Sequence, residues 1–251
     1  MCLILFAYEP GPTATLVVAA NRDEFYARPA RRAHIWKDHP GIFAGRDETG
    51  GGTWLGVNEN GRFAAVTNFT EPGDPEAPCS RGNLTRNFLT SATPASEYAH
   101  HLHGPDYAGF NLLLFDNDEL VYTSNKGVTR VLGPGFYGLS NAELGAEWPK
   151  VIRGIRQLRA LCEATPTADA LIGLLHDDQV PPDAELPHRG RPLEMERCVA
   201  PCFIRGEEYG TRASTAVVFE EGTIRFTEQS YDAGGIPLDR VDTAIQRTQG
   251  V

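Results

Sequence analysis

The chain has 251 residues, 41% hydrophobic and 22% charged, which is typical of a globular protein whose core needs no disulfide or metal to hold it. Its 33 acidic residues outnumber 23 Lys and Arg, and the net charge of −10 argues against a broad surface for nucleic acid or anionic membranes. No apolar stretch approaches the roughly 20 residues of a transmembrane segment, and the apolar N-terminus lacks the basic leader and cleavage site of a signal peptide.

Strand-like runs dominate the first seventy residues and form two predicted hairpins: 3–8 with 14–20, and 54–58 with 63–69. The first hairpin turns at Pro10-Gly11, and the second turns at Asn60-Gly61, a pair that suits a turn with positive φ. The basic run 28–32 between the hairpins predicts a solvated loop. The alternative is an anion-binding rim for an acidic ligand.

Helices are predicted next at four places: 80–91, 94 to about 103, 148–162 and 167–176. Further strands are predicted at 110–115, 120–124, 128–132, 136–139, near 202–204, and at 212–219 and 223–228. The helix over 148–162 is the clearest, because apolar residues recur at helical spacing while Lys150 and three arginines take the other faces. Residues 177–195 are rich in proline and charge and predict a loop, either a lid or a disordered insert.

This order of elements predicts the fold class and the domain organisation. Strands made largely of hairpins, with helices in separate blocks, favour a layered α+β domain of two antiparallel sheets packed face to face and covered by helices. No repeat or linker divides the chain, so we expect one domain over residues 1–251. The five cysteines lack the spacing of a disulfide scaffold, which favours a reducing, cytoplasmic setting.

Cys2 is the most informative residue, because it follows Met1 directly and opens an apolar run. If Met1 is removed, Cys2 presents a nucleophilic thiol together with a free α-amine, whose pKa of about 7.7–8.0 suits a general base. If Met1 is retained, the nitrogen is an amide and cannot act as a base. The alternative interpretation is a buried strand cysteine that behaves as a small hydrophobic residue.

Polar residues near strand ends could share a site with Cys2. The first hairpin returns residues 21–24 towards Cys2, where a carboxylate would hold the amine and a guanidinium would stabilise a thiolate. Adjacent Arg22 and Asp23 should point to opposite faces of a regular strand, and we favour Asp23 as the one that faces Cys2. Asn68 lies at the end of a predicted strand and Asn141 just past one, where an asparagine is often an ordinary turn residue. Arg212, at the start of a strand, could be an ordinary ion-pair partner at the edge of a sheet.

Six motifs in combination carry a resemblance to a known family: Cys2, Asn21-Arg22-Asp23-Glu24, Gly51-Gly52-Thr53-Trp54-Leu55-Gly56, Thr67-Asn68-Phe69, Gly138-Leu139-Ser140-Asn141 and Thr211-Arg212-Ala213-Ser214-Thr215. The chain resembles the NRDE family, the family of the transport and Golgi organisation protein two, to about residue 230. It is similar, more distantly, to the N-terminal nucleophile (Ntn) hydrolases of the bile-salt hydrolase and penicillin V acylase group. In that group the arginine and the aspartate are separated by two residues, whereas Arg22 and Asp23 are adjacent here.

The resemblance implies a four-layer αββα sandwich and a cysteine amidohydrolase that acts on a non-peptide C–N bond of a small acyl substrate. It implies that Cys2 is nucleophile and base and that Asp23 orients the amine, with no metal or other cofactor required. The two asparagines would bind the oxyanion, and arginines would supply positive charge. The expected catalytic residues are Cys2, Asp23, Asn68, Asn141 and Arg212, and the expected substrate-binding residues are Asn21, Arg22 and Glu24.

A second function remains open at this point. Members of the NRDE family are linked to haem handling and lipid metabolism, so the same cleft could belong to a non-catalytic carrier or chaperone that binds haem or an acyl lipid. A fold does not fix a function. A scaffold without any small-molecule ligand is a third possibility.

Overall fold

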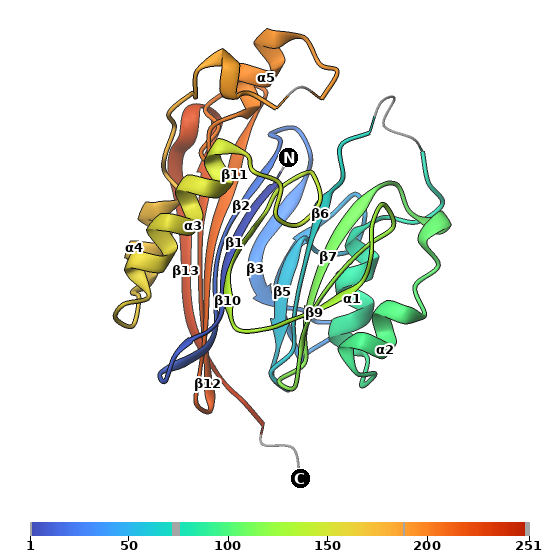
Figure 1. Cartoon of the computed structure of the whole chain (residues 1–251). Coiled ribbons are helices and arrows are strands. Elements are labelled where there is room, and N and C mark those ends of the chain that lie inside the picture. Colours follow the sequence, from blue (N-terminus) through green and yellow to red (C-terminus); the bar gives the residue numbers. More distant parts are fainter. Residues whose placement is uncertain (1, 72–75, 188, 249–251) are drawn as a thin grey trace.

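The structure of the protein is a computed structural model, and it describes residues 2–71, 76–187 and 189–248. Two antiparallel sheets lie face to face (Figure 1). The six-stranded sheet has the order β10-β1-β2-β11-β12-β13, formed by Gly135–Leu139, Cys2–Gly11, Ala14–Phe25, Tyr209–Glu220, Thr223–Asp232 and Ile236–Gln246. The seven-stranded sheet runs in sequence order from β3 to β9, formed by Ala30–Ile35, Ile42–Asp47, Leu55–Asn58, Phe63–Asn68, Phe110–Phe115, Leu120–Ser124 and Arg130–Leu132.

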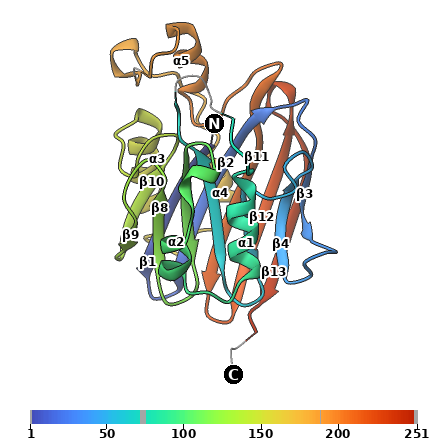
Figure 2. The same cartoon turned by 90° about the vertical axis from the view of Figure 1, so that its right-hand side faces the viewer.

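Helices cover the outer face of each sheet. Helices α3 (Pro149–Leu161) and α4 (Ala168–Leu174) pack on the six-stranded sheet, and α1 (Gly82–Thr90) and α2 (Ala95–His100) pack on the seven-stranded one (Figure 2). Helix α5 (Leu193–Val199) lies beyond the sheets, at the end of the sandwich where β1 begins (Figure 1). Within the described ranges, no helix combines the length and apolar character that crossing a membrane would demand.

Three hydrophobic cores hold the layers together and confirm the predicted α+β sandwich. One lies between the sheets, and the other two lie between each sheet and its helices. Strand β1 explains how: Ile4 and Phe6 face the other sheet, whereas Leu3 and Leu5 face α3 and α4. Because β1 is buried on both faces, it appears in the sequence as a continuous apolar run rather than an alternating one.

Strands β3, β4 and β13 were not expected from the sequence. Two of them, β3 and β13, are the edges of their sheets and carry exposed charged residues, which obscure the alternating apolar pattern. The prediction of a solvated loop for the basic run 28–32 is therefore wrong for its last three residues, which begin β3.

Other local predictions also need correction. Residues 202–204 form no strand; they lie buried in an irregular segment, where the Phe203 N–H donates to the Asp177 carbonyl at 2.9 Å. Strands β9 and β10 do not continue one sheet, because the chain crosses from the seven-stranded to the six-stranded sheet between them. The predicted loop 177–195 includes the short 3-10 helix Asp183–Glu185 and the beginning of α5.

Candidate active site

Cys2 begins the strand β1, between β2 and β10, and its backbone is fixed on both sides. Its N–H donates to Asn141 Oδ1 at 3.3 Å, and its carbonyl accepts a hydrogen bond from Ser140 Oγ at 2.9 Å. Burial raises the pKa of the Cys2 thiol, although the backbone N–H of Asp23 and the Arg22 guanidinium act in the opposite direction. The thiol is therefore protonated at neutral pH and needs a base to become a nucleophile.

Asn141 connects Cys2 to the other sheet. Its Nδ2 donates to the Asn68 carbonyl at 2.8 Å, while its backbone carbonyl accepts from the Thr70 N–H at 2.8 Å. The Asn141 side chain is buried, whereas Asn68, the last residue of β6, is exposed. The structure thus brings Cys2 and both predicted asparagines together at one end of the sandwich, with Asn141 in the middle.

A buried polar network holds the backbone on both sides of Asn141. Thr67 Oγ1 donates to the Ser140 carbonyl at 2.6 Å, and Asn111 Nδ2 donates to the Ala142 carbonyl at 2.9 Å. Tyr122 in turn donates to Asn111 Oδ1 at 2.8 Å. No sequence expectation named Asn111, yet a lone asparagine within the apolar run of β7 is a usable signal, because a buried amide needs partners.

The tetrapeptide 21–24 divides its side chains between two faces of the sheet. Cys2 and Arg22 are directly paired across β1 and β2, so both lie on the face towards the other sheet, while Asn21 and Asp23 lie on the helix face. The expectation that Asp23 faces Cys2 is therefore wrong: Arg22 does. The irregularity is instead in β11, where Thr211 pairs with Asp23 and Ala213 pairs with Arg22. Arg212 is therefore the extra residue of a bulge, which redirects its side chain.

Asp23 lies beside a buried lysine. Thr211 Oγ1 donates to Asp23 Oδ1 at 2.7 Å. Burial raises the pKa of the Asp23 carboxyl, and the positive charge of Lys150 and the Thr211 hydrogen bond lower it. Burial likewise lowers the pKa of Lys150, and Asp23 opposes that change. Asp23 and Lys150 therefore influence each other's ionisation on the helix side of the six-stranded sheet.

The expectation that Lys150 lies on the polar face of its helix is wrong, because only 2% of the residue is exposed. It stands in the first turn of α3, and its Nζ donates to the Val199 carbonyl at 3.0 Å, at the end of α5. Helical spacing could not reveal this burial, because the segment that covers Lys150 is distant in sequence.

Asn21 fastens the two ends of the segment that carries α5. Its Nδ2 donates to the carbonyls of Leu175, at 3.0 Å, and Cys202, at 2.8 Å. Its Oδ1 accepts from Ser214 Oγ at 2.6 Å. The expected substrate-binding role of Asn21 does not fit this arrangement, because the buried amide is fully engaged within the protein. We call the described residues between these two anchor points, 176–187 and 189–201, the cap segment.

The cap segment covers the end of the sandwich at which β1 begins. The guanidinium of Arg189 lies over the rings of Trp148, at 5.3 Å, and Phe69, at 6.0 Å, and forms an ion pair with Glu143 at 3.6 Å. Phe69 directly follows Asn68, so the cap reaches the residues around Cys2. The half-buried state of Cys2 agrees with this cover.

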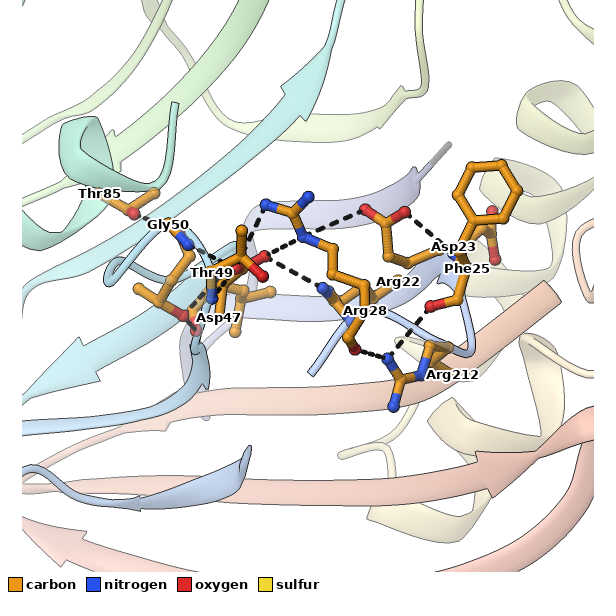
Figure 3. A network of polar contacts seen from close by, with 12 residues as sticks. Arg22, Asp23, Phe25, Arg28, Asp47, Thr49, Gly50, Thr85 and Arg212 are labelled. Carbon is orange, nitrogen blue, oxygen red and sulfur yellow. Dashed lines mark hydrogen bonds and ion pairs between the residues drawn. The ribbon is translucent and has the colours of Figure 1, made fainter. Parts of the chain in front are cut away.

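Arg22 and Arg28 share one carboxylate (Figure 3). Asp47 contacts Arg28 Nε at 2.6 Å and Arg22 Nη2 at 3.4 Å, and the Arg22 guanidinium also lies 4.3 Å from the Trp54 ring. Glu24, the last residue of the tetrapeptide, is 3.9 Å from Arg28 Nε. Arg22 lies on the same face of the sheet as Cys2. Glu24 contacts Arg28, which shares Asp47 with Arg22.

Arg212 points to backbone rather than to the thiol. Its Nη1 donates to the Phe25 carbonyl at 3.3 Å and also to the Arg28 carbonyl (Figure 3). Among the residues that the structure describes, no three His, Cys, Asp or Glu side chains are grouped as metal ligands would be.

Comparison with protein families gives a match along most of the chain. The model of the family "Transport and Golgi organisation 2" matches residues 1–233. The chain is 37% identical over 258 residues to the Transport and Golgi organization protein 2 homolog of Bos taurus, covering 92% of this chain and 93% of that protein. The homolog of Homo sapiens is 35% identical, with the same coverage.

Solved structures agree with the architecture. The chain superposes on the mutant C2A conjugated bile acid hydrolase of Clostridium perfringens with a TM-score of 0.53, covering 100% of this chain and 97% of that one. For the N-acylethanolamine-hydrolyzing acid amidase ortholog of Caenorhabditis elegans, the TM-score is 0.52, with 86% and 92% covered. Sequence identity is 10% in both cases, so the likeness concerns the fold alone.

Proposed function

The chain belongs to the Transport and Golgi organisation 2 family, and from this premise we propose that it is a cysteine amidohydrolase of the Ntn type. Its substrate would be a small molecule with a non-peptide acyl amide bond. The observation that carries the proposal is the position of Cys2 at the start of a central strand, with its nitrogen hydrogen-bonded to Asn141 Oδ1. After removal of Met1, that nitrogen is a free amine.

The first half of the reaction uses both groups of Cys2. The amine accepts the thiol proton as the sulfur attacks the substrate carbonyl carbon, and a C–S bond forms. Asn141 Oδ1 holds the amine, and the paired charges of Asp23 and Lys150 lie behind it. Arg22, which faces the same side as Cys2, stabilises the negative charge on sulfur.

The second half releases both products. The side chain of Asn68, exposed at the end of β6, donates to the oxyanion, and the ammonium group gives its proton to the leaving nitrogen as the C–N bond breaks. Water then attacks the thioester while the amine accepts a water proton. The acid leaves, and that proton returns to the sulfur.

Mass spectrometry tests the proposal. A thiol-reactive acyl probe should label Cys2 in a protein that lacks Met1, and should fail to label Cys2→Ala at this position. Cys198→Ala is the matched control, because Cys198 is an exposed cysteine on α5, and its loss should leave Cys2 labelling unchanged. Retention of Met1 together with an unlabelled Cys2 would remove the mechanism.

One observation favours the second candidate, a non-catalytic carrier of haem or an acyl lipid. The Asn141 side-chain N–H is directed at the Asn68 carbonyl, so only Asn68 is placed to donate to an oxyanion from this pair. Titration with hemin and with acyl-coenzyme A distinguishes the two functions. Binding that survives Cys2→Ala, without turnover of any amide, would support the carrier.

A further inference from the structure

A groove of about 430 Å³ opens between the two sheets, next to β3. Its walls come from β2, β3, β11, β12 and the beginning of β13, together with Trp54, and Arg22 is the residue that it shares with the strand pair of Cys2. Cys2 itself does not line the groove. We propose that this groove binds an organic anion, with its carboxylate or phosphate group at Arg22 and Arg212 and its apolar part against Trp54 and Leu238.

Cationic side chains predominate among the residues that line the groove. The charged or titratable ones are Arg22, Arg31, Arg32, His34, Arg212, Glu228 and Asp239. The two outer arginines already have acidic partners, Arg31 with Glu48 and Arg32 with Asp239 at 2.7 Å. The inner pair, Arg22 and Arg212, therefore provides the positive charge that is available to a bound anion.

Arg22 is only partly compensated within the protein. Among the residues that the structure describes, its one ion pair is the 3.4 Å contact with Asp47, and that carboxylate is held more closely by Arg28, at 2.6 Å. Asp47 also accepts hydrogen bonds from the backbone N–H groups of Thr49 and Gly50. Arg22 is nevertheless 94% buried, and a buried guanidinium gains from a second negative partner.

Arg212 has no acidic partner within ion-pair distance among the described residues. Its hydrogen bonds go to two backbone carbonyls, and its buried Nε has no hydrogen-bond partner there. Burial lowers the pKa of Arg212, and the like charge of Arg22 lowers it further. Two guanidinium groups that repel each other at the wall of one groove form an attractive site for an anion.

The apolar part of the groove indicates the rest of the ligand. The Trp54 ring, against which Arg22 stacks, is half-buried, and Leu238 at the start of β13 is 55% exposed. Tyr231 and Ala213 complete this surface. An anion with an apolar body would cover Leu238 and fill the groove, whereas a bare inorganic ion would leave it uncovered.

Two acids line the groove: Asp239 is paired with Arg32, and the buried Glu228 sets the conditions of the experiment. Its carboxylate accepts the Ala33 N–H at 2.6 Å, and burial raises its pKa to about 7. A titration below that value, at about pH 6, keeps Glu228 mainly neutral, so its charge does not oppose the ligand.

Calorimetric titration with decanoate, with decanamide as the neutral equivalent and with inorganic phosphate, tests the proposal. We expect decanoate to bind at least about tenfold more tightly than either other probe. Arg212→Gln should weaken decanoate binding about tenfold or more. Arg225→Gln should not, because Arg225 is 67% exposed, outside the groove and paired with Glu220.

A second variant covers the case in which Arg212→Gln does not fold. Leu238→Glu changes an exposed position and places a negative charge at the mouth of the groove, so it should also weaken decanoate binding. Equal affinity for decanoate and decanamide, or decanoate binding unaffected by Leu238→Glu, would overturn the proposal. Cys2→Ala should bind decanoate as the wild type does, so this result is independent of whether Cys2 acts as a nucleophile.

Discussion

The side chain of Asn141 accepts the backbone N–H of Cys2 through Oδ1, at 3.3 Å. Its other polar atom, Nδ2, donates to the Asn68 carbonyl at 2.8 Å, so one buried amide spans the gap between the two sheets. The amide thereby fixes the position of the group that would become the α-amine of Cys2. In a mature protein, the amine would inherit this partner without any rearrangement of the strand.

Replacement of Asn141 should therefore affect both stability and turnover. Asn141→Ala leaves the Asn68 carbonyl without its donor, and the cost should be about 1–3 kcal/mol in the free energy of unfolding. Asn141→Asp keeps an oxygen for the Cys2 nitrogen. If the proposed mechanism holds, Asn141→Asp should retain more of kcat than Asn141→Ala. Equal kcat for the two variants would argue against a role for Asn141 Oδ1 at the amine.

Asn21→Ala should release the cap segment. The change removes the donor to the Leu175 and Cys202 carbonyls and leaves Ser214 without its acceptor, so we expect a loss of about 2–4 kcal/mol of stability. Hydrogen exchange should rise first within the cap segment. Asn87→Ala, an exposed helix position, is the control and should leave that exchange unchanged. If Asn21→Ala raised hydrogen exchange equally along the whole chain, Asn21 would not hold the cap segment locally.

The Asp23–Lys150 relationship can be measured by a double-mutant cycle. Lys150→Met removes the donor to the Val199 carbonyl and a buried positive charge that favours the ionised Asp23 carboxyl, which should destabilise the protein by about 1–3 kcal/mol. Adding Asp23→Asn removes the carboxylate whose ionisation Lys150 favours, so Lys150→Met should cost less stability in that background than in the wild type. Urea unfolding of the four proteins gives the coupling energy. A coupling of zero would mean that the two charges act independently.

Glu228 should make stability depend on pH. Its pKa is about 7 in the folded protein, against an ordinary value of 4.5, because burial disfavours the charged carboxylate. Between these values the folded state keeps a proton that the unfolded state has lost, so this contribution to stability disappears as pH rises through about 7. Over that interval the loss should be about 3 kcal/mol.

The measurement compares wild type with Glu228→Gln by urea unfolding at about pH 5 and about pH 8. The glutamine keeps an oxygen that can accept the Ala33 N–H but does not titrate. The wild type should therefore lose more stability than the variant on going to the higher pH, and identical losses would show that Glu228 does not titrate in this range.

The sequence by itself determined the layered architecture, and the family motifs within it predicted that Cys2 shares a site with Asn68 and Asn141. Hairpins follow from local turns and apolar runs, and strand ends that carry polar residues gather at the same end of a sandwich. The sequence also predicted that the side chains of Arg22 and Asp23 point to opposite faces of the sheet, because successive side chains alternate along any extended strand. The family motifs extended these local patterns to a shared fold.

Only the tertiary structure decided which of the two residues faces the thiol side, what covers Lys150 and where Arg212 points. Asp23 and its partner Thr211 are 188 residues apart, and the bulge at Arg212 exists only because β11 pairs with β2. Lys150 is buried by a cap segment about fifty residues further along the chain. Local sequence patterns report backbone periodicity, whereas burial and charge compensation depend on which distant segments pack against it.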